Sequence, residues 1–218
     1  MTAYKAVLFD LDGTLLDTLD DLAGAANQVL EKRGLPVHPR EAYKYFVGDG
    51  LQVLLERIVP AEERKPALLN ELAQDFRQVY GQTWQVHSRP YPEIDAMLAS
   101  LAGSGMRLAV LSNKPHDFTL LCVNNLLPGH SFDLVLGQRE GVGKKPDPAG
   151  ALEVANSLSL APEQFLYLGD TAVDMETAKR AGMCAVGVLW GFRDEVELRD
   201  AGAEHILHSP MEAIHLLA

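Results

Sequence analysis

Short apolar segments alternate with helical segments along most of the chain, and this alternation limits the folds that the sequence can adopt. Strand-like runs at 107–111, 134–136, 165–168 and 184–188 are separated by segments with helical spacing at 93–101, 117–126, 148–158 and 173–181. Strands that alternate with helices of this length form a parallel sheet with helices on both faces. A last segment, 194–218, adds two short helices around a possible edge strand at 205–207. The sequence predicts an α/β fold with a doubly wound sheet.

The first strand, expected at 4–11, is far in sequence from its next partner at 107–111. A gap of roughly ninety residues is too long for a loop. Within it, segments 22–30, 41–46, 51–58 and 65–79 carry apolar residues at three- and four-residue spacing, which is typical of helices. Prolines separate these segments, and 88–92 forms the return linker. We therefore predict a core domain of residues 1–14 plus 87–218, with residues 15–86 inserted as a helical subdomain.

Composition excludes several classes of function. The chain has 218 residues, is 47% hydrophobic and carries a net charge of −11, so nucleic acids and anionic membranes are poor partners. Its first residues lack the pattern of a signal peptide, and its longest apolar stretch, 183–192, is far short of the ~20 residues of a membrane span. Cys122 and Cys184 are far apart, which favours two reduced, buried thiols over a disulfide. We expect a cytoplasmic protein without membrane contact.

The expected first strand ends in Asp10-Leu-Asp12-Gly13-Thr14. Residues i and i+2 of a strand point the same way, so both carboxylates should face one spot. Two such acids repel each other unless a cation or a shared proton holds them, which predicts a metal site, an acid/base role, or both. The simpler alternative is a turn at the end of the strand, stabilised by aspartate side chains.

Three further strand ends or loops carry polar residues: Ser112-Asn113, the loop around Lys145, and Gly169-Asp170 with Asp174 four residues after Asp170. Each has a structural alternative, as a helix cap, a solvated loop lysine and a pair of helix-dipole acids, respectively. In α/β folds, however, the carboxyl ends of strands converge on one crevice. Together they would offer carboxylates for a hard cation, and a hydroxyl, backbone N–H groups and a lysine for an anion.

A charge count supports a shared site. Asp10, Asp12, Asp170 and Asp174, balanced by Lys145 and one Mg²⁺, would leave a net charge of −1 before any anion binds. One carboxyl group should therefore hold a proton when an anionic substrate is present, and it would be a ready general acid. Asp12 is our candidate for this group.

The order D-x-D-G-T, Ser-Asn, Lys-Pro-x-Pro and G-D-x-x-x-D, from Asp10 to Asp174, resembles the haloacid dehalogenase superfamily of phosphatases. The resemblance implies a Rossmann-like core with a helical cap inserted after the first motif. It also implies that Asp10 attacks phosphorus to form an aspartyl-phosphate, and that Asp12 protonates the leaving alkoxide and then activates water. Mg²⁺ would be bound by Asp10, the backbone carbonyl of Asp12 and Asp170, with Asp174 bound directly or through another ligand.

By the same resemblance, Ser112 and the backbone N–H of Asn113 would hold the phosphoryl oxygens, and Lys145 would neutralise their charge. Segments 16–22 and 47–50 resemble bacterial phosphoglycolate phosphatases, which implies 2-phosphoglycolate as substrate and Gly48 as a contact, although a turn between helices explains Gly48 as well. Two residues depart from that pattern: Leu19 replaces a frequent proline, and Asp49 adds an acid to a loop expected to face the substrate.

Several alternatives share this core. The substrate could be a sugar phosphate, a nucleoside monophosphate or pyrophosphate, and a sugar-phosphate mutase would use the same acids. A phosphonate hydrolase would need a cap lysine, for which Lys44 is the nearest candidate. Asp12 argues against a dehalogenase, and the complete set of motifs argues against a binding protein without turnover. The sequence leaves a monomer and a homodimer open.

Overall fold

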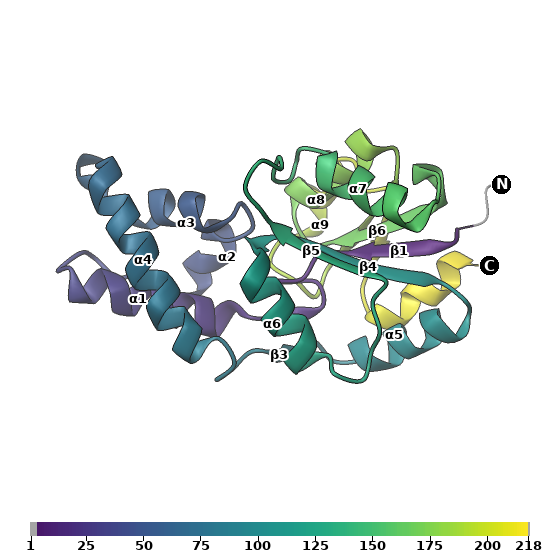
Figure 1. Cartoon of the computed structure of the whole chain (residues 1–218), viewed down its shortest axis with the longest axis horizontal. Coiled ribbons are helices and arrows are strands. Elements are labelled where there is room, and N and C mark those ends of the chain that lie inside the picture. Colours follow the sequence, from purple (N-terminus) through teal and green to yellow (C-terminus); the bar gives the residue numbers. More distant parts are fainter. Residues whose placement is uncertain (1–3, 218) are drawn as a thin grey trace.

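The computed structural model describes residues 4–217, so residues 1–3 and 218 of the expected core lie outside the described part. A six-stranded sheet with helices on both faces lies beside a separate group of helices (Figure 1). The strand order is β5-β4-β1-β6-β7-β8 and every neighbouring pair is parallel. The strands are β1 (Ala6–Phe9), β4 (Arg107–Pro115), β5 (Leu134–Gln138), β6 (Phe165–Gly169), β7 (Cys184–Val188) and β8 (His205–Leu207). The predicted α/β fold class is confirmed.

Both faces of the sheet are buried, which explains why its strands are apolar throughout. In β1, Val7 and Phe9 belong to one hydrophobic cluster, whereas Ala6 and Leu8 belong to another. The first cluster includes side chains of α5 (Ile94–Gly103), α6 (His116–Leu126) and the 3₁₀ helix η4 (Pro210–Leu217). The second includes α7 (Ala149–Leu158), α8 (Ala172–Ala181) and α9 (Glu195–Asp200), and the short 3₁₀ helix η3 (Pro162–Gln164) leads into β6.

The inserted helices form the cap at the other end of the molecule, drawn in purple and blue in Figure 1. They are α1 (Leu19–Lys32), η1 (Arg40–Ala42), α2 (Tyr43–Phe46), α3 (Leu51–Ile58), η2 (Ala61–Glu63) and α4 (Pro66–Thr83). Helix α4 packs against α1 and α3. Leu30 of α1, Leu55 of α3 and Leu72 of α4 are buried. An inserted helical subdomain is therefore present, while its limits at residues 15 and 86 stay a prediction. Among residues 4–217, no helix is both long enough and apolar enough to cross a membrane.

The chain crosses between core and cap twice, and the two crossings pair with each other. Strands β2 (Leu16–Asp17) and β3 (Arg89–Pro90) form a two-stranded antiparallel sheet. We expected only helices and a linker here, because a two-residue strand is too short to show alternation. On α1, the buried carboxylate of Asp21 accepts hydrogen bonds from the backbone N–H groups of His87 and Ser88 and from the Ser88 hydroxyl, at 2.7–3.0 Å.

The first strand is shorter than expected, since β1 ends at Phe9 rather than at residue 11. The carbonyl of Leu11 accepts hydrogen bonds from the N–H groups of residues 14–16, and Gly13 adopts a φ of +92° that favours glycine. Asp10 still bonds to β6, through its N–H to the Leu168 carbonyl at 2.9 Å, whereas Asp12 lies next to the turn, so strand alternation does not relate the two side chains. In contrast, β4 continues past residue 111 to Pro115, so it carries the Ser112-Asn113 motif within the strand.

Candidate active site

Three motifs meet because of the strand order. Strand β1 lies between β4 and β6, so Asp10 after β1, Ser112 in β4 and Asp170 after β6 are brought to one edge of the sheet. All three side chains are buried. The convergence predicted from the carboxyl ends of the strands is present.

Lys145 is buried in the middle of this group. Its Nζ donates to Asp10 Oδ1 at 2.6 Å, to Asp174 Oδ1 at 2.7 Å and to the Leu111 carbonyl at 3.2 Å. Burial alone would lower the pKa of Lys145, but Asp10 and Asp174 raise it well above its usual value. The alternative of a solvated loop lysine is wrong, because the loop folds inward and places the ammonium between two carboxylates.

Asn113 holds the backbone of this lysine. The Asn113 side chain accepts from the Lys145 N–H at 2.9 Å and donates to the Lys145 carbonyl at 3.1 Å. The same amide group donates to the carbonyl of Gly48 in the cap at 3.0 Å. One side chain thus connects β4, the Lys145 loop and the cap.

Three buried acids lie together: one carboxylate oxygen from each of Asp10, Asp170 and Asp174 fits within 4.8 Å of the others. Burial raises the pKa of Asp10 to about 7 despite the neighbouring Lys145, and Asp174 adds to the rise. Burial, Asp10 and Asp174 hold the pKa of Asp170 well above its usual range. This negative charge exceeds what Lys145 can balance, and oxygen donors are what a hard divalent cation prefers, so the residues fit Mg²⁺.

The surrounding residues fix two of these acids. Asp170 accepts from the Thr14 hydroxyl at 3.1 Å and from the Phe192 N–H at 2.9 Å. Asp174 Oδ2 accepts from the Thr171 hydroxyl at 2.7 Å and from the Thr171 N–H at 3.2 Å, where α8 begins. Asp174 therefore does stabilise the start of α8, through hydrogen bonds with Thr171, and it contacts Lys145 as well.

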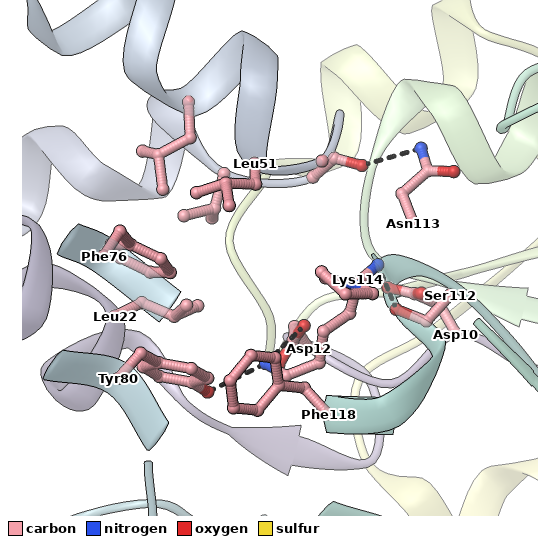
Figure 2. A pocket seen from close by; sticks show the side chains of 15 residues that line it. Asp10, Asp12, Leu22, Leu51, Phe76, Tyr80, Ser112, Asn113, Lys114 and Phe118 are labelled. Atoms are coloured by element: carbon pink, nitrogen blue, oxygen red, sulfur yellow. Dashed lines mark hydrogen bonds and ion pairs between the residues drawn. The ribbon is translucent and has the colours of Figure 1, made fainter. Parts of the chain in front are cut away.

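Asp12 occupies a different environment, and its partner there is a lysine that our sequence analysis did not name. Its carboxylate lies 2.9 and 3.1 Å from Nζ of Lys114 and accepts from the Thr18 hydroxyl at 2.6 Å. Lys114 is buried and also donates to the hydroxyl of Tyr80 at 2.8 Å (Figure 2). The position of Lys114, directly after Ser112-Asn113, was a signal for it, but nothing in the sequence pointed to Tyr80.

A cleft lies between cap and core. Its floor is polar, and Ser112, Asp10 and Asp12 lie there near Lys114 (Figure 2). Its walls are mostly apolar, and they come from Leu22, Val47, Leu51, Leu54, Phe76 and Tyr80 of the cap region and from Phe118 of α6. Such walls exclude water from a reacting group and strengthen the electrostatic interactions beside it.

The cap loop reaches this cleft through Gly48 and Gly50 but not through Asp49. The loop faces the cleft as expected, but the Asp49 carboxylate pairs with Arg57 at 2.6 Å instead of lining the cleft. Lys44 is also absent from the residues that line the cleft and pairs with Glu41 at 2.9 Å. Lys44 is therefore not placed to form a Schiff base with a substrate in the cleft, as a phosphonate hydrolase would require.

Comparisons with known proteins agree with this geometry. The model of the haloacid dehalogenase-like hydrolase family matches residues 7–188. The chain is 33% identical over 213 residues to a phosphoglycolate phosphatase of Aquifex aeolicus, covering 98% of this chain and 96% of the relative. It is 32% identical over 216 residues to a phosphoglycolate phosphatase of Nitrosospira multiformis, covering 98% of this chain and 95% of the relative.

Solved structures give the same result. A haloacid dehalogenase-like family hydrolase from Streptococcus pneumoniae superimposes with a TM-score of 0.89 at 26% identity, covering 100% of both chains. The family model spans all four motifs, and the relatives extend through both core and cap. This chain belongs to the haloacid dehalogenase-like hydrolase family.

Proposed function

We propose that this protein hydrolyses a small phosphate monoester, 2-phosphoglycolate, to glycolate and phosphate through an aspartyl-phosphate on Asp10. Its family and its phosphatase relatives make it a phosphoric monoester hydrolase. The observation that carries the proposal is the position of Asp10: it lines the cleft while Lys145 holds one of its oxygens at 2.6 Å. The other oxygen is then left for attack on a phosphorus atom.

In the first step, a carboxylate oxygen of Asp10 bonds to phosphorus, and the bond from phosphorus to the ester oxygen breaks. Asp12 donates a proton to the departing oxygen, which leaves as an alcohol. Ser112 and the backbone N–H of Asn113 hold the phosphoryl oxygens, and Lys145 balances their charge. Phosphoryl transfer depends mainly on such positioning and charge stabilisation.

In the second step, Asp12 accepts a proton from water, and the water oxygen bonds to phosphorus. The bond between phosphorus and Asp10 breaks, which releases phosphate and restores the carboxylate. Asp12 is suited to both steps because its side chain is 16% exposed at the cleft, whereas that of Asp10 is 9% exposed beside Lys145.

We assign the metal site to the carboxylates of Asp10 and Asp170 and to the backbone carbonyl of Asp12. A Mg²⁺ ion bound there would stabilise negative charge on the phosphoryl group. Asp174 Oδ1 lies 2.7 Å from the Lys145 ammonium, a cation that competes with a metal ion for this oxygen, whereas the oxygens of Asp170 accept from uncharged donors, the Thr14 hydroxyl and the Phe192 N–H. We therefore propose that Asp174 acts on the site chiefly by holding Lys145, with any direct contact to the metal as a minor role.

The relatives named phosphoglycolate phosphatases support 2-phosphoglycolate over other small esters. The remaining candidates are sugar phosphates, nucleoside monophosphates and pyrophosphate, and a mutase would retain the aspartyl-phosphate longer. A cytoplasmic location and a monomeric or dimeric state remain predictions from the sequence.

Phosphate release from 2-phosphoglycolate and these alternatives, with and without Mg²⁺, tests the proposal. We expect a preference for 2-phosphoglycolate of at least tenfold in kcat/KM, which corresponds to about 1.4 kcal/mol, and no release in excess chelator. Another preferred substrate would disprove the narrow assignment, and unchanged rates in chelator would disprove the metal site.

Asp10→Asn should abolish turnover on every substrate, because an amide is a poor nucleophile. Asp95→Asn is the matched control, since Asp95 is 74% exposed on α5 and pairs with His130, away from the cleft lining. Near-normal phosphate release by the Asp10 variant would exclude it as the nucleophile.

A further inference from the structure

Lys114 is a buried cation that has no role in the two chemical steps proposed above. Its ammonium lies on the floor of the cleft, at the foot of an apolar wall, with its side chain only 4% exposed. It contacts both oxygens of Asp12 and the hydroxyl of Tyr80. A lysine is costly to bury, and the Asp12 carboxylate offsets that cost; an ammonium on the floor of the cleft could share its charge with an anion of the substrate.

Lys114 is also close to where the leaving part of a substrate must lie. To donate a proton, Asp12 must come within about 2.6–3.2 Å of the ester oxygen. Nζ of Lys114 is 2.9 Å from Oδ1 of that same carboxylate. An atom group attached one carbon away from the ester oxygen is therefore within reach of the ammonium.

Tyr80 supplies a second donor at the same place. Its oxygen accepts a hydrogen bond from Lys114, so its own O–H is left to donate. The ring of Tyr80 also lies beneath the ammonium, 4.8 Å from Nζ, and it packs against Phe76 and Phe118. These contacts fix the hydroxyl and the ammonium side by side.

We propose that Lys114 and Tyr80 together bind an anionic group, such as a carboxylate, carried one carbon from the ester oxygen on the leaving part of the substrate. The group replaces the longer contact, 3.1 Å, between Lys114 and Asp12. Apolar residues such as Leu54 and Phe76 form the wall around it and exclude water, which strengthens the ion pair. This inference rests on the proposed phosphatase activity and makes Lys114 a determinant of specificity.

The test compares Lys114→Met with the unchanged enzyme on 2-phosphoglycolate and on 2-hydroxyethyl phosphate. The two esters have the same length, but the second ends in a neutral hydroxyl. The measured quantity is the ratio of their kcat/KM values. We expect the unchanged enzyme to favour 2-phosphoglycolate and the ratio to fall about 30-fold or more in the variant, the size typical of losing one partner of a buried charge pair.

Two further variants refine the result. Lys114→Arg keeps the charge and should retain part of the preference, whereas Tyr80→Phe should lower the ratio by about three- to tenfold through the loss of one hydrogen bond. Lys32→Met is the control for the substitution itself: Lys32 is 63% exposed on α1 and pairs with Asp75, and the ratio should not change.

An equal loss on both esters would overturn the proposal, because it would show that Lys114 only positions Asp12. If Lys114→Met loses all activity, Tyr80→Phe provides the test. An unchanged ratio of the two kcat/KM values in that variant would overturn the proposal. Phospholactate separates this inference from the substrate assignment. If it replaces 2-phosphoglycolate as the preferred ester and Lys114→Met removes that preference, Lys114 has the proposed role and the assignment of 2-phosphoglycolate fails.

Discussion

Asp10 and Asp12 are two residues apart, yet the structure gives them different partners. Asp10 is buried against Lys145, whereas Asp12 lies at the cleft between Lys114 and Thr18. Environments that separate two acids in this way assign them separate roles in catalysis. The nucleophile is held in place, and the acid has access to the leaving oxygen.

This division predicts how Asp12→Asn depends on the leaving group. On an alkyl phosphate such as 2-phosphoglycolate, kcat/KM should fall by about 10²–10⁴, because the departing alkoxide needs a proton. On p-nitrophenyl phosphate the loss in the first step should be far smaller, since a nitrophenolate leaves without one. Phosphoenzyme formation measured by rapid quench on both esters checks this, and equal losses would show that Asp12 is not the acid.

Gly13 is the residue that lets the turn after β1 approach the metal site. A Cβ at this position would collide with the Asp170 carboxylate, and the φ of +92° disfavours side chains. Gly13→Ala should therefore abolish stabilisation by Mg²⁺ in a thermal melt as well as lower the melting temperature. In Gly105→Ala, the control, φ is +80° and nothing lies near the added atom, so only strain of roughly 1–2 kcal/mol is expected. A normal Mg²⁺ response in Gly13→Ala would contradict this account.

At the scale of elements, the joint between core and cap depends on Asp21 at the start of α1. Its buried carboxylate receives hydrogen bonds from His87 and Ser88 of the returning chain, next to the β2–β3 pair. Charged acceptors with several donors contribute more than neutral hydrogen bonds. The cap is thereby attached to its own return linker as well as through the strand pair.

Asp21→Ala should lower the free energy of unfolding by about 2–4 kcal/mol, because it leaves buried N–H groups without an acceptor. The neighbouring Asp20→Ala is the control. Asp20 pairs with Arg40, but its side chain is 39% exposed, and exposed pairs contribute about 0–1 kcal/mol. Urea unfolding of both variants measures the difference, and similar values for the two would refute the proposed joint.

Helix and strand positions were mostly predictable from periodicity, and α3 and β7 begin and end at the expected residues. The errors occur where local patterns are weak or where tertiary contacts decide. Strand β1 ends early because Gly13 and the hydrogen bonds to Leu11 turn the chain, and β2 and β3 are too short to show a pattern.

At the scale of the whole molecule, folding concentrates negative charge that a cation must offset. Burial raises the pKa of Asp10 from 3.8 to about 7 and that of Asp170 well above its usual value. A raised pKa means that the folded state holds the proton more tightly than the unfolded state. In metal-free protein, this contribution to stability is present at acidic pH and is lost as pH rises from about 4 through 7.

Mg²⁺ should therefore stabilise the protein more at pH 7.5 than at pH 5, because at pH 5 it must displace protons. At a concentration of 100 times its Kd, the ion should add about 2.7 kcal/mol at the higher pH. Thermal melts with and without Mg²⁺ at both pH values measure this effect, and Asp170→Asn should remove it. An equal shift at both pH values would show that the metal does not bind these acids.

The parallel sheet, the helical insertion and the four motifs could be predicted from the sequence, because strand length, helical spacing and residue order are local properties. Parallel strands placed Asp10, Ser112 and Asp170 at the same end of the sheet, and the strand order, with β1 between β4 and β6, brought them next to one another. Three further features come from the folded chain: Lys114 contacts both Asp12 and Tyr80, Asp49 pairs with Arg57, and Lys145 is buried between two acids. These contacts join residues up to 135 positions apart, and side-chain packing in three dimensions, rather than any sequence pattern, selects such partners.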